Sequence, residues 1–344
     1  MSRAFPAARR RSRAAGPSPP GAGAPSIATV PFPNWTAVLR FLPCLRAVLV
    51  AGACVAAACG RPDARAAGRP SGPAAVLGVD DFGDTVRAAP PPARIVSLNP
   101  TTTELLFALG AGGRLVGRTH WDVYPDAARA VADLGDGLRP NVEAVLAARP
   151  ALVILYASAD NRAAAAAFRR AGVPVVALKI DRVAQFAAAS RLLGRVVGDS
   201  AAGAVTADTV LATIARVRAA TAGRPRVRAL WPLFDDPLYV IGGGSYLSEL
   251  MDAAGADNVF GDLPQPSPQV AREEALRRNA DVVFSSPAGA RRMAREAGWA
   301  SLAAVRTGRV YAVDSSLVLR PGVRLGEAAV MLAERLGAAA GPVR

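Results

Sequence analysis

The sequence predicts an α/β fold of two lobes with mostly parallel sheets, joined by one long α-helix. From Arg94 onward, short apolar runs alternate with helical patterns, which is typical of β-α units in a parallel sheet. The alternation forms two similar series, one before residue 199 and one after residue 223. Between them, residues 200–222 contain no proline and no glycine after Gly203, which favours one helix about 30 Å long. A surface helix of a single domain is the alternative for this stretch.

The N-terminal lobe is expected to cover residues 94–199. Thr101 is followed three residues later by Glu104, a pattern typical of a capping box in which both side chains bind free N–H groups of a helix. This places a helix N-terminus just beyond the carboxyl end of a strand, the edge at which open parallel sheets bind ligands. The expected strands are 95–98, 115–118, 152–156 and 173–178, and the expected helices are 102–109, 142–148, 161–171 and 183–197.

The C-terminal lobe is expected to cover residues 223–344, with residues 200–222 as the bridging helix. The glycine run before Ser245 lacks the lysine of a phosphate-binding loop and the spacing of a dinucleotide-binding motif. It therefore predicts a tight turn with Ser245 as the helix N-cap. The expected strands are 227–231, 238–241, 282–285 and 310–313, and the expected helices are 246–254, 271–278, 290–297 and 324–337.

Residues 1–59 predict a disordered extension followed by a signal peptide. The apolar run 47–58 follows Arg40 and Arg46, a layout typical of a signal peptide, and it is shorter than the about 20 residues that cross a bilayer. Cys59 follows three alanines and resembles the lipidated cysteine of bacterial lipoproteins. We therefore expect an exported protein, periplasmic or at the cell surface, that is anchored to the membrane through Cys59.

Several alternatives for this region stay open. Ala56 stands where the lipoprotein motif usually has leucine, and Cys54 is a weaker candidate for the lipidated residue. The same run is also compatible with plain secretion or with a buried apolar segment of the fold. The composition of residues 1–37 is typical of disorder, and a signal peptide of normal length would begin near Val38. Residues 60–93 are expected to be a linker and lead-in.

The charge distribution argues against a nucleic-acid partner. The formal net charge is +14, but half of this excess comes from seven arginines in residues 1–59, which contain no acidic residue. In the rest of the chain, arginines are interspersed with Asp and Glu, without the aromatic-interleaved basic stripe that binds single strands.

Cysteine and histidine usage limits the chemistry of the body. All three cysteines precede residue 60, so the body has no disulfide, no cysteine-based zinc site and no cysteine nucleophile. His120 is the only histidine, which argues against a dedicated metal site and against a nucleophile, base and orienter set. We expect no enzyme activity and no resident cofactor.

Six segments carry a resemblance to a known family. They are Ser97–Glu104, Gly117–Pro125, Pro140–Glu143, Arg149–Ile154, Gly242–Gly255 and Asn258–Phe260. Together they resemble the bridging-helix (class III) substrate-binding proteins of ABC transporters for cobalamin and iron-siderophore uptake, over about residues 94–336. The resemblance implies a small-molecule ligand held between the lobes and a partner permease in the membrane. A corrinoid is the leading ligand. Ser267 stands where cobalamin-binding relatives often carry tryptophan, so a ferric siderophore or haem is the alternative.

The resemblance also implies two kinds of site residue. Glu143 and Glu273, one on each lobe, match the glutamates that meet arginines of the permease; by position alone, both could instead be first-turn glutamates favoured by the helix dipole. Aromatic faces at strand ends suit a macrocycle, although each could belong to the core. An exported enzyme or sensor domain on the same scaffold is the alternative function. The candidate ligand-binding residues are His120, Trp121, Tyr124, Tyr156, Trp231, Phe234, Tyr246 and Arg320.

Overall fold

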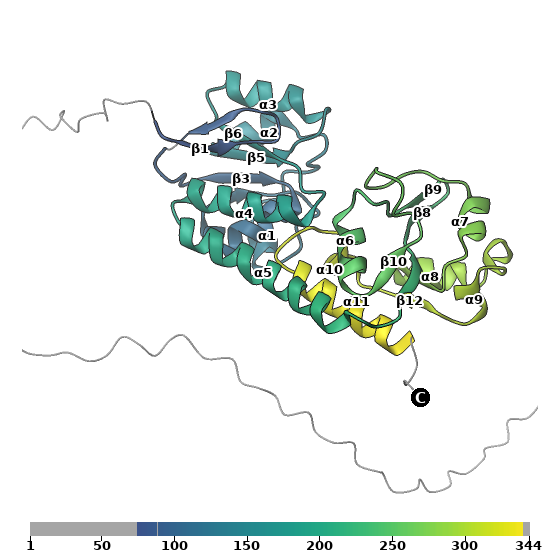
Figure 1. Ribbon diagram of the computed structural model, residues 1–344. Coiled ribbons are helices and arrows are strands. Elements are labelled where there is room, and N and C mark those ends of the chain that lie inside the picture. The colour runs from purple at the N-terminus through teal and green to yellow at the C-terminus, as the bar shows by residue number, and fades with distance from the viewer. Residues whose placement is uncertain (1–73, 88, 340–344) are drawn as a thin grey trace, which may run out of the picture. The chain divides into compact units, whose positions relative to one another are not determined.

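The structure is a computed structural model that describes residues 74–87 and 89–339. The predicted extension, the signal peptide and Cys59 lie outside these residues. The fold class is confirmed: two α/β lobes, each with a parallel sheet, are joined by α5 (Ser200–Thr221) (Figure 1).

The N-terminal lobe is built on one parallel sheet whose strands lie in the order β4-β3-β5-β6. Alternate strand residues face opposite sides. Ile95 and Ile154 pack in one apolar cluster with α1 and α4, while Val96 and Val153 pack in another with α2 and α3. Helices therefore cover both faces of the sheet, as in other parallel sheets. The elements are β3 (Ile95–Leu98), α1 (Pro100–Ala108), η1 (Gly112–Arg114), β4 (Leu115–Gly117), η2 (Asp126–Ala130), α2 (Val142–Ala147), β5 (Leu152–Tyr156), α3 (Asn161–Arg170), β6 (Val175–Leu178) and α4 (Val183–Val197).

The C-terminal lobe repeats this plan with the strand order β10-β7-β11-β12, all parallel. Phe284 packs in the cluster that contains α6 and α11, and Val283 packs in the cluster that contains α7, α8 and α9. The elements are β7 (Val227–Leu230), β8 (Pro232–Asp235), β9 (Leu238–Val240), α6 (Tyr246–Ala253), β10 (Ala256–Asn258), α7 (Arg272–Arg278), β11 (Val282–Ser285), α8 (Pro287–Met293), η3 (Ala297–Trp299), α9 (Ala303–Arg306), β12 (Val310–Ala312), α10 (Ser315–Val318) and α11 (Leu325–Ala339).

Three strands of this lobe differ from the expectation. The strand expected at 238–241 exists as β9, but it pairs antiparallel with β8, which was not expected, in a hairpin outside the parallel sheet. The edge position of that sheet is taken by β10, which was not expected because Ala256–Asn258 contains a single apolar residue.

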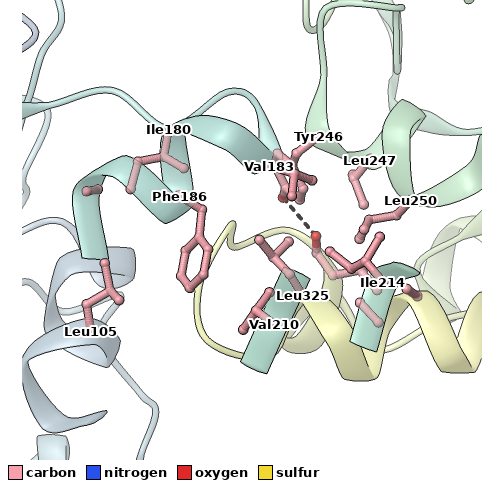
Figure 2. Close-up of a cluster of buried hydrophobic side chains, with 14 of the residues drawn as sticks. Leu105, Ile180, Val183, Phe186, Val210, Ile214, Tyr246, Leu247, Leu250 and Leu325 are labelled. Atoms are coloured by element: carbon pink, nitrogen blue, oxygen red, sulfur yellow. Dashed lines mark hydrogen bonds between the residues drawn. The ribbon is translucent and has the colours of Figure 1, made fainter. Parts of the chain in front are cut away.

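The bridging helix α5 is packed against both lobes. Its residues Val210 and Ile214 lie in one apolar cluster with Leu105 of α1 and Leu325 of α11 (Figure 2). Near its start, α5 approaches α4 closely, since a Cβ on Gly194 would lie 2.8 Å from the Cα of Gly203. The bridge is therefore held along its length by side chains of the two lobes.

The described part of the expected linker contains a hairpin. It consists of β1 (Val76–Val79) and β2 (Thr85–Arg87), which pair antiparallel. Buried Asp80 accepts backbone hydrogen bonds from Phe82 and Asp84 at 3.0 and 2.9 Å, and from Ala177 of β6 at 3.0 Å. The lead-in is thus tied to the edge strand of the N-terminal lobe.

The capping of α1 differs from the predicted capping box. The N-cap is Asn99, whose side chain accepts from the Thr101 amide at 3.0 Å, and Pro100 occupies the first turn. Glu104 caps nothing, because its side chain is buried and paired with arginines of the other lobe. The prediction for Ser245 is confirmed, since its side chain accepts from the Leu247 amide at 3.2 Å.

Candidate ligand-binding site

A pocket of about 230 Å³ is lined by residues of both lobes. Asn99 follows β3, Tyr156 ends β5 and Asp181 follows β6, so these three mark the carboxyl edge of the N-terminal sheet. Tyr246 and Arg320 line the pocket from the C-terminal lobe. The pocket therefore lies at the edge where parallel sheets bind ligands.

A second pocket of about 200 Å³ adjoins the first, because both are lined by Asn99, Pro100 and Tyr156. It adds the side chains of Trp121 and Leu138, each 58% exposed. Large exposed apolar side chains beside a pocket are typical of a ligand-binding surface. The combined site has a polar part around Arg320 and an apolar part around Trp121.

Buried hydrogen bonds next to Trp121 fix the loop that carries it. Buried Asp122 accepts hydrogen bonds from the hydroxyls of Thr103 and Thr119, both at 2.5 Å. Burial raises the pKa of Asp122, against the opposing effect of these two donors. Exposed His120 lies against Trp121, with ring centroids 4.4 Å apart and planes tilted by 52°. Trp121 is thus an exposed ring on a fixed backbone.

The two pocket tyrosines have different hydrogen-bond states. The Tyr156 hydroxyl lies 3.4 Å from Asp181 Oδ1, and burial together with Asp181 raises the pKa of Tyr156 to about 12. The Tyr246 hydroxyl donates to the Val318 carbonyl at 2.8 Å, and burial raises the pKa of Tyr246 above its usual range. Both phenols stay protonated at neutral pH, and Tyr246 presents its ring to the pocket.

Two sets of contacts join the lobes near this pocket, and each includes a residue of its lining. On one side, the Tyr246 amide donates to the Asp181 carbonyl at 2.6 Å, Arg182 pairs with Glu249, and Glu249 also accepts from the Val183 amide at 2.9 Å. On the other side, Arg320 donates to the Trp121 carbonyl at 2.6 Å.

Trp231 is not a cleft residue, contrary to the expectation. It is 2% exposed and packs against Phe284 with ring centroids 5.4 Å apart. Its position directly after β7 turns it into the core, where its backbone carbonyl accepts from the Ile241 amide at 2.9 Å.

The other candidates divide into two groups. Trp121, Tyr156, Tyr246 and Arg320 line the two pockets. His120, Tyr124 and Phe234 do not: Phe234 is 66% exposed on β8, and Tyr124 lies under the Arg324 guanidinium at 3.8 Å. The lining residues Asn99, Asp181 and Leu138 were missed. For Asn99, its place directly after a strand was the available signal.

Glu143 and Glu273 occupy equivalent places in the two lobes. Each is the exposed second residue of its helix, α2 or α7. Each helix ends near a non-glycine residue in the left-handed region, Arg149 with φ 48° and Asn279 with φ 45°. The two glutamates are therefore related by the internal repeat of the fold.

Two further kinds of site are absent from the residues that the structure describes. They contain no group of three or more His, Cys, Asp or Glu side chains placed to hold a metal ion. None of the helices described is both long and apolar enough to cross a membrane.

The chain is similar to known binding proteins. An ABC transporter substrate-binding lipoprotein of Bacillus subtilis, YvrC, is 28% identical over 254 residues, which are 71% of this chain and 80% of that protein. The crystal structure of the vitamin B12-binding protein BtuF of Vibrio cholerae is 25% identical, with a TM-score of 0.65 over 74% of this chain and 100% of that one. The heme-binding protein RhuT from Roseiflexus sp. RS-1 is 27% identical, with a TM-score of 0.66 over 72% of this chain and 98% of that one.

The family model described as periplasmic binding protein matches residues 95–317, from the first strand of the N-terminal sheet to α10. That match spans both sheets, the bridging helix and most of the pocket wall between the lobes, and the chain therefore belongs to the periplasmic binding protein family.

Proposed function

We propose that this chain is the extracytoplasmic substrate-binding component of an ABC importer and that it captures a corrinoid between its lobes. The observation that carries the proposal is the two-part site, in which the exposed ring of Trp121 adjoins a polar pocket lined from both lobes. Each pocket is below the about 300–1,000 Å³ of typical ligand sites, so a macrocycle would lie partly over Trp121 and Leu138. We also propose that the body is divided as the sequence predicts, into an N-terminal lobe (94–199), a bridging helix (200–222) and a C-terminal lobe (223–344).

A ferric siderophore or haem is the second candidate ligand. Arg320 favours it, because a guanidinium pairs well with the carboxylate or other anionic groups of such ligands. The similarity to a heme-binding protein points the same way. Tyr156 and Tyr246 complete the proposed contact set, whereas His120, Tyr124 and Phe234 lie outside both pockets and Trp231 is buried in the core.

Transport would need a partner permease, and a lipid anchor would keep the protein near it. We assign the permease contacts to Glu143 and Glu273, whose equivalent exposed positions suit two-point docking, and charge complementarity speeds such encounters. Cys59 is the proposed lipid attachment site, in line with the lipoprotein name of YvrC.

Titration decides the ligand. The purified protein should bind one of cyanocobalamin, haemin or a ferric hydroxamate, and mass spectrometry should recover that ligand chemically unchanged. Converted ligand would favour an exported enzyme, and failure to bind any of the three would contradict the ligand assignment.

A further inference from the structure

Glu104 is a buried carboxylate that reaches from one lobe to the other. Its side chain lies on α1 and is 1% exposed, with Oε1 3.2 Å from Arg324 Nη2 and 4.0 Å from Arg320 Nη1. Both arginines belong to the C-terminal lobe, in the segment between α10 and α11. A buried charge is tolerated only when it is paired, so this contact is a strong constraint on the two segments.

The arginines also hold other groups of the N-terminal lobe. Arg320 donates to the Trp121 carbonyl at 2.6 Å, and the Arg324 guanidinium lies 3.8 Å from the ring centre of Tyr124. Arg324 is fixed from its own side by the Ser316 carbonyl at 2.6 Å. Glu104 therefore lies at the centre of the contacts that join the segment 320–324 to the first lobe.

Gly322 permits this approach. A Cβ at this position would overlap Glu104 Oε2. With any larger residue, either the carboxylate or the segment would have to shift, and the contact between them would change. Glu104 Oε2, Arg320 Nη1 and Arg324 Nε are buried and have no hydrogen-bond partner within the described part of the chain, so the cluster does not have a full set of hydrogen bonds.

We propose that Glu104 is a positioning residue for ligand capture, which holds the segment 320–324 against the N-terminal lobe and so fixes Arg320 at the wall of the pocket. The inference deepens the proposed function, because it states what keeps the two lobes in register around the ligand. Glu104 itself touches no ligand, since it lines neither pocket.

The charges around Glu104 make its contact with the segment 320–324 depend on pH. The groups that face it are Arg320, Arg324, Asp122 and Tyr246. Burial raises the pKa of Glu104 to about 7, although Arg324 and Arg320 oppose the shift. A state in which the segment has moved away would expose the carboxylate and return its pKa toward 4.5, so the joined state binds the proton more tightly. Mild acid should therefore favour the joined state.

Interlobe distances test the proposal without reference to any ligand. Spin labels are placed at Arg170→Cys and Arg291→Cys, both exposed, in a full chain whose Cys44, Cys54 and Cys59 are replaced by serine. Glu104→Ala should broaden the distance distribution, whereas Glu104→Gln should keep it narrow, because its amide oxygen still accepts from Arg324. The wild-type distribution should narrow as the pH falls from 8 to 6 (about one unit on either side of the raised pKa), and that of Glu104→Gln should not.

A second variant and a matched control keep the test decisive. Gly322→Ala should broaden the distribution as Glu104→Ala does, and it serves if Glu104→Ala fails to fold. Glu327→Ala, on the exposed side of α11, should change nothing. With the ligand that the wild type binds, Glu104→Ala and Gly322→Ala should each lose about tenfold in affinity.

Unchanged distances in both variants would overturn the inference. If the wild type binds none of cyanocobalamin, haemin or a ferric hydroxamate, the proposed ligands fail, but the distance measurement still decides the role of Glu104.

Discussion

Two tryptophans with the same expected role have opposite environments. Trp121 and Trp231 both follow strands and both belong to α/β lobes, and the sequence pattern does not separate them. The structure does, because Trp121 is carried out of its lobe by an anchored loop while Trp231 is turned into the core. Whether each tryptophan is buried depends on how the neighbouring strands pack in three dimensions. A sequence pattern does not contain this information.

Replacing each tryptophan by alanine should therefore have different effects. Trp121→Ala should leave stability within about 0.5 kcal/mol and weaken ligand binding about three- to tenfold through the lost ring contact. Trp231→Ala should cost about 3–5 kcal/mol of unfolding free energy because it leaves a core cavity. Denaturant unfolding and ligand titration of both variants check this. Equal loss of stability in the two would contradict the assignment.

Glu104 should also make the unfolding free energy depend on pH. Its pKa is raised from 4.5 to about 7 in the folded chain, so folding takes up a proton between these values. The associated stability is complete below about pH 4.5 and is lost as the pH rises through 7, on the order of 3 kcal/mol in all. The unfolding free energy of wild type minus that of Glu104→Gln should fall by this amount between pH 4.5 and 8. A flat difference would contradict the raised pKa.

At the scale of elements, both lobes repeat one helix-to-strand unit. Arg94 donates to the carbonyls of Ala148 and Arg149 at the end of α2, at 2.6 and 2.9 Å, and Arg228 donates to the Arg278 carbonyl at the end of α7. Since each arginine lies at the start of its lobe's first sheet strand, the same contact fixes both helices against their sheets. This explains why the glutamates at the starts of α2 and α7 hold equivalent positions.

Glu143→Ala with Glu273→Ala should separate transport from binding. Both side chains are exposed, so stability and ligand affinity should stay almost unchanged. Uptake in cells should fall, and replacement of both by Arg should reduce it further through repulsion from permease arginines. Glu334→Ala, also exposed, is the control. Normal uptake by the double variant would refute the docking assignment, and lost ligand binding would move the glutamates to the pocket.

Periodic helices and short apolar strands were predictable from the sequence, as the strands expected at 95–98 and 282–285 show, while short strands of mixed polarity were not. The helix expected at 183–197 has those bounds in the structure, because its apolar positions repeat over four turns. The strands β8 and β10 contain four and three residues and mix apolar with polar residues, so they show neither a period nor an apolar run. For the site, Tyr156 and Arg320 could be proposed from strand ends and composition. Asp181 and Leu138 could not, because tertiary packing alone brings their loops to the pocket.

At the scale of the whole molecule, the bridge is part of the core. Because α5 packs against α4, α6 and α11, bending it would break apolar contacts of both lobes. A rigid joint of this kind permits less motion than a flexible hinge.

Ligand binding should therefore change the radius of gyration very little. Small-angle scattering with and without ligand measures this directly. As a comparison, Ala212→Gly with Ala215→Gly on the exposed side of α5 should allow more contraction, since each glycine weakens a helix by about 1 kcal/mol without removing an apolar contact. A large contraction of the wild type would contradict the rigid bridge.

The proposed membrane anchor depends on one residue. Cys59→Ala should move the protein from the membrane fraction to the soluble fraction of cells, because it removes the proposed lipid attachment site. Cys54→Ala is the matched control and should stay membrane-bound. If wild type and Cys59→Ala fractionate alike, Cys59 is not the anchor.

The hairpin β1–β2 also covers the edge strand β6 of the N-terminal sheet. Strand β6 ends the N-terminal sheet, and Asp80 and Asp81 bind its outward amides of Ala177 and Lys179, at 3.0 and 2.6 Å, while the Asp81 amide binds the Ala177 carbonyl at 2.9 Å. A free sheet edge recruits strands from other copies and starts aggregation. Trimming the chain to begin at Arg94 would remove this cover, so we expect the trimmed protein to associate through the edge of β6.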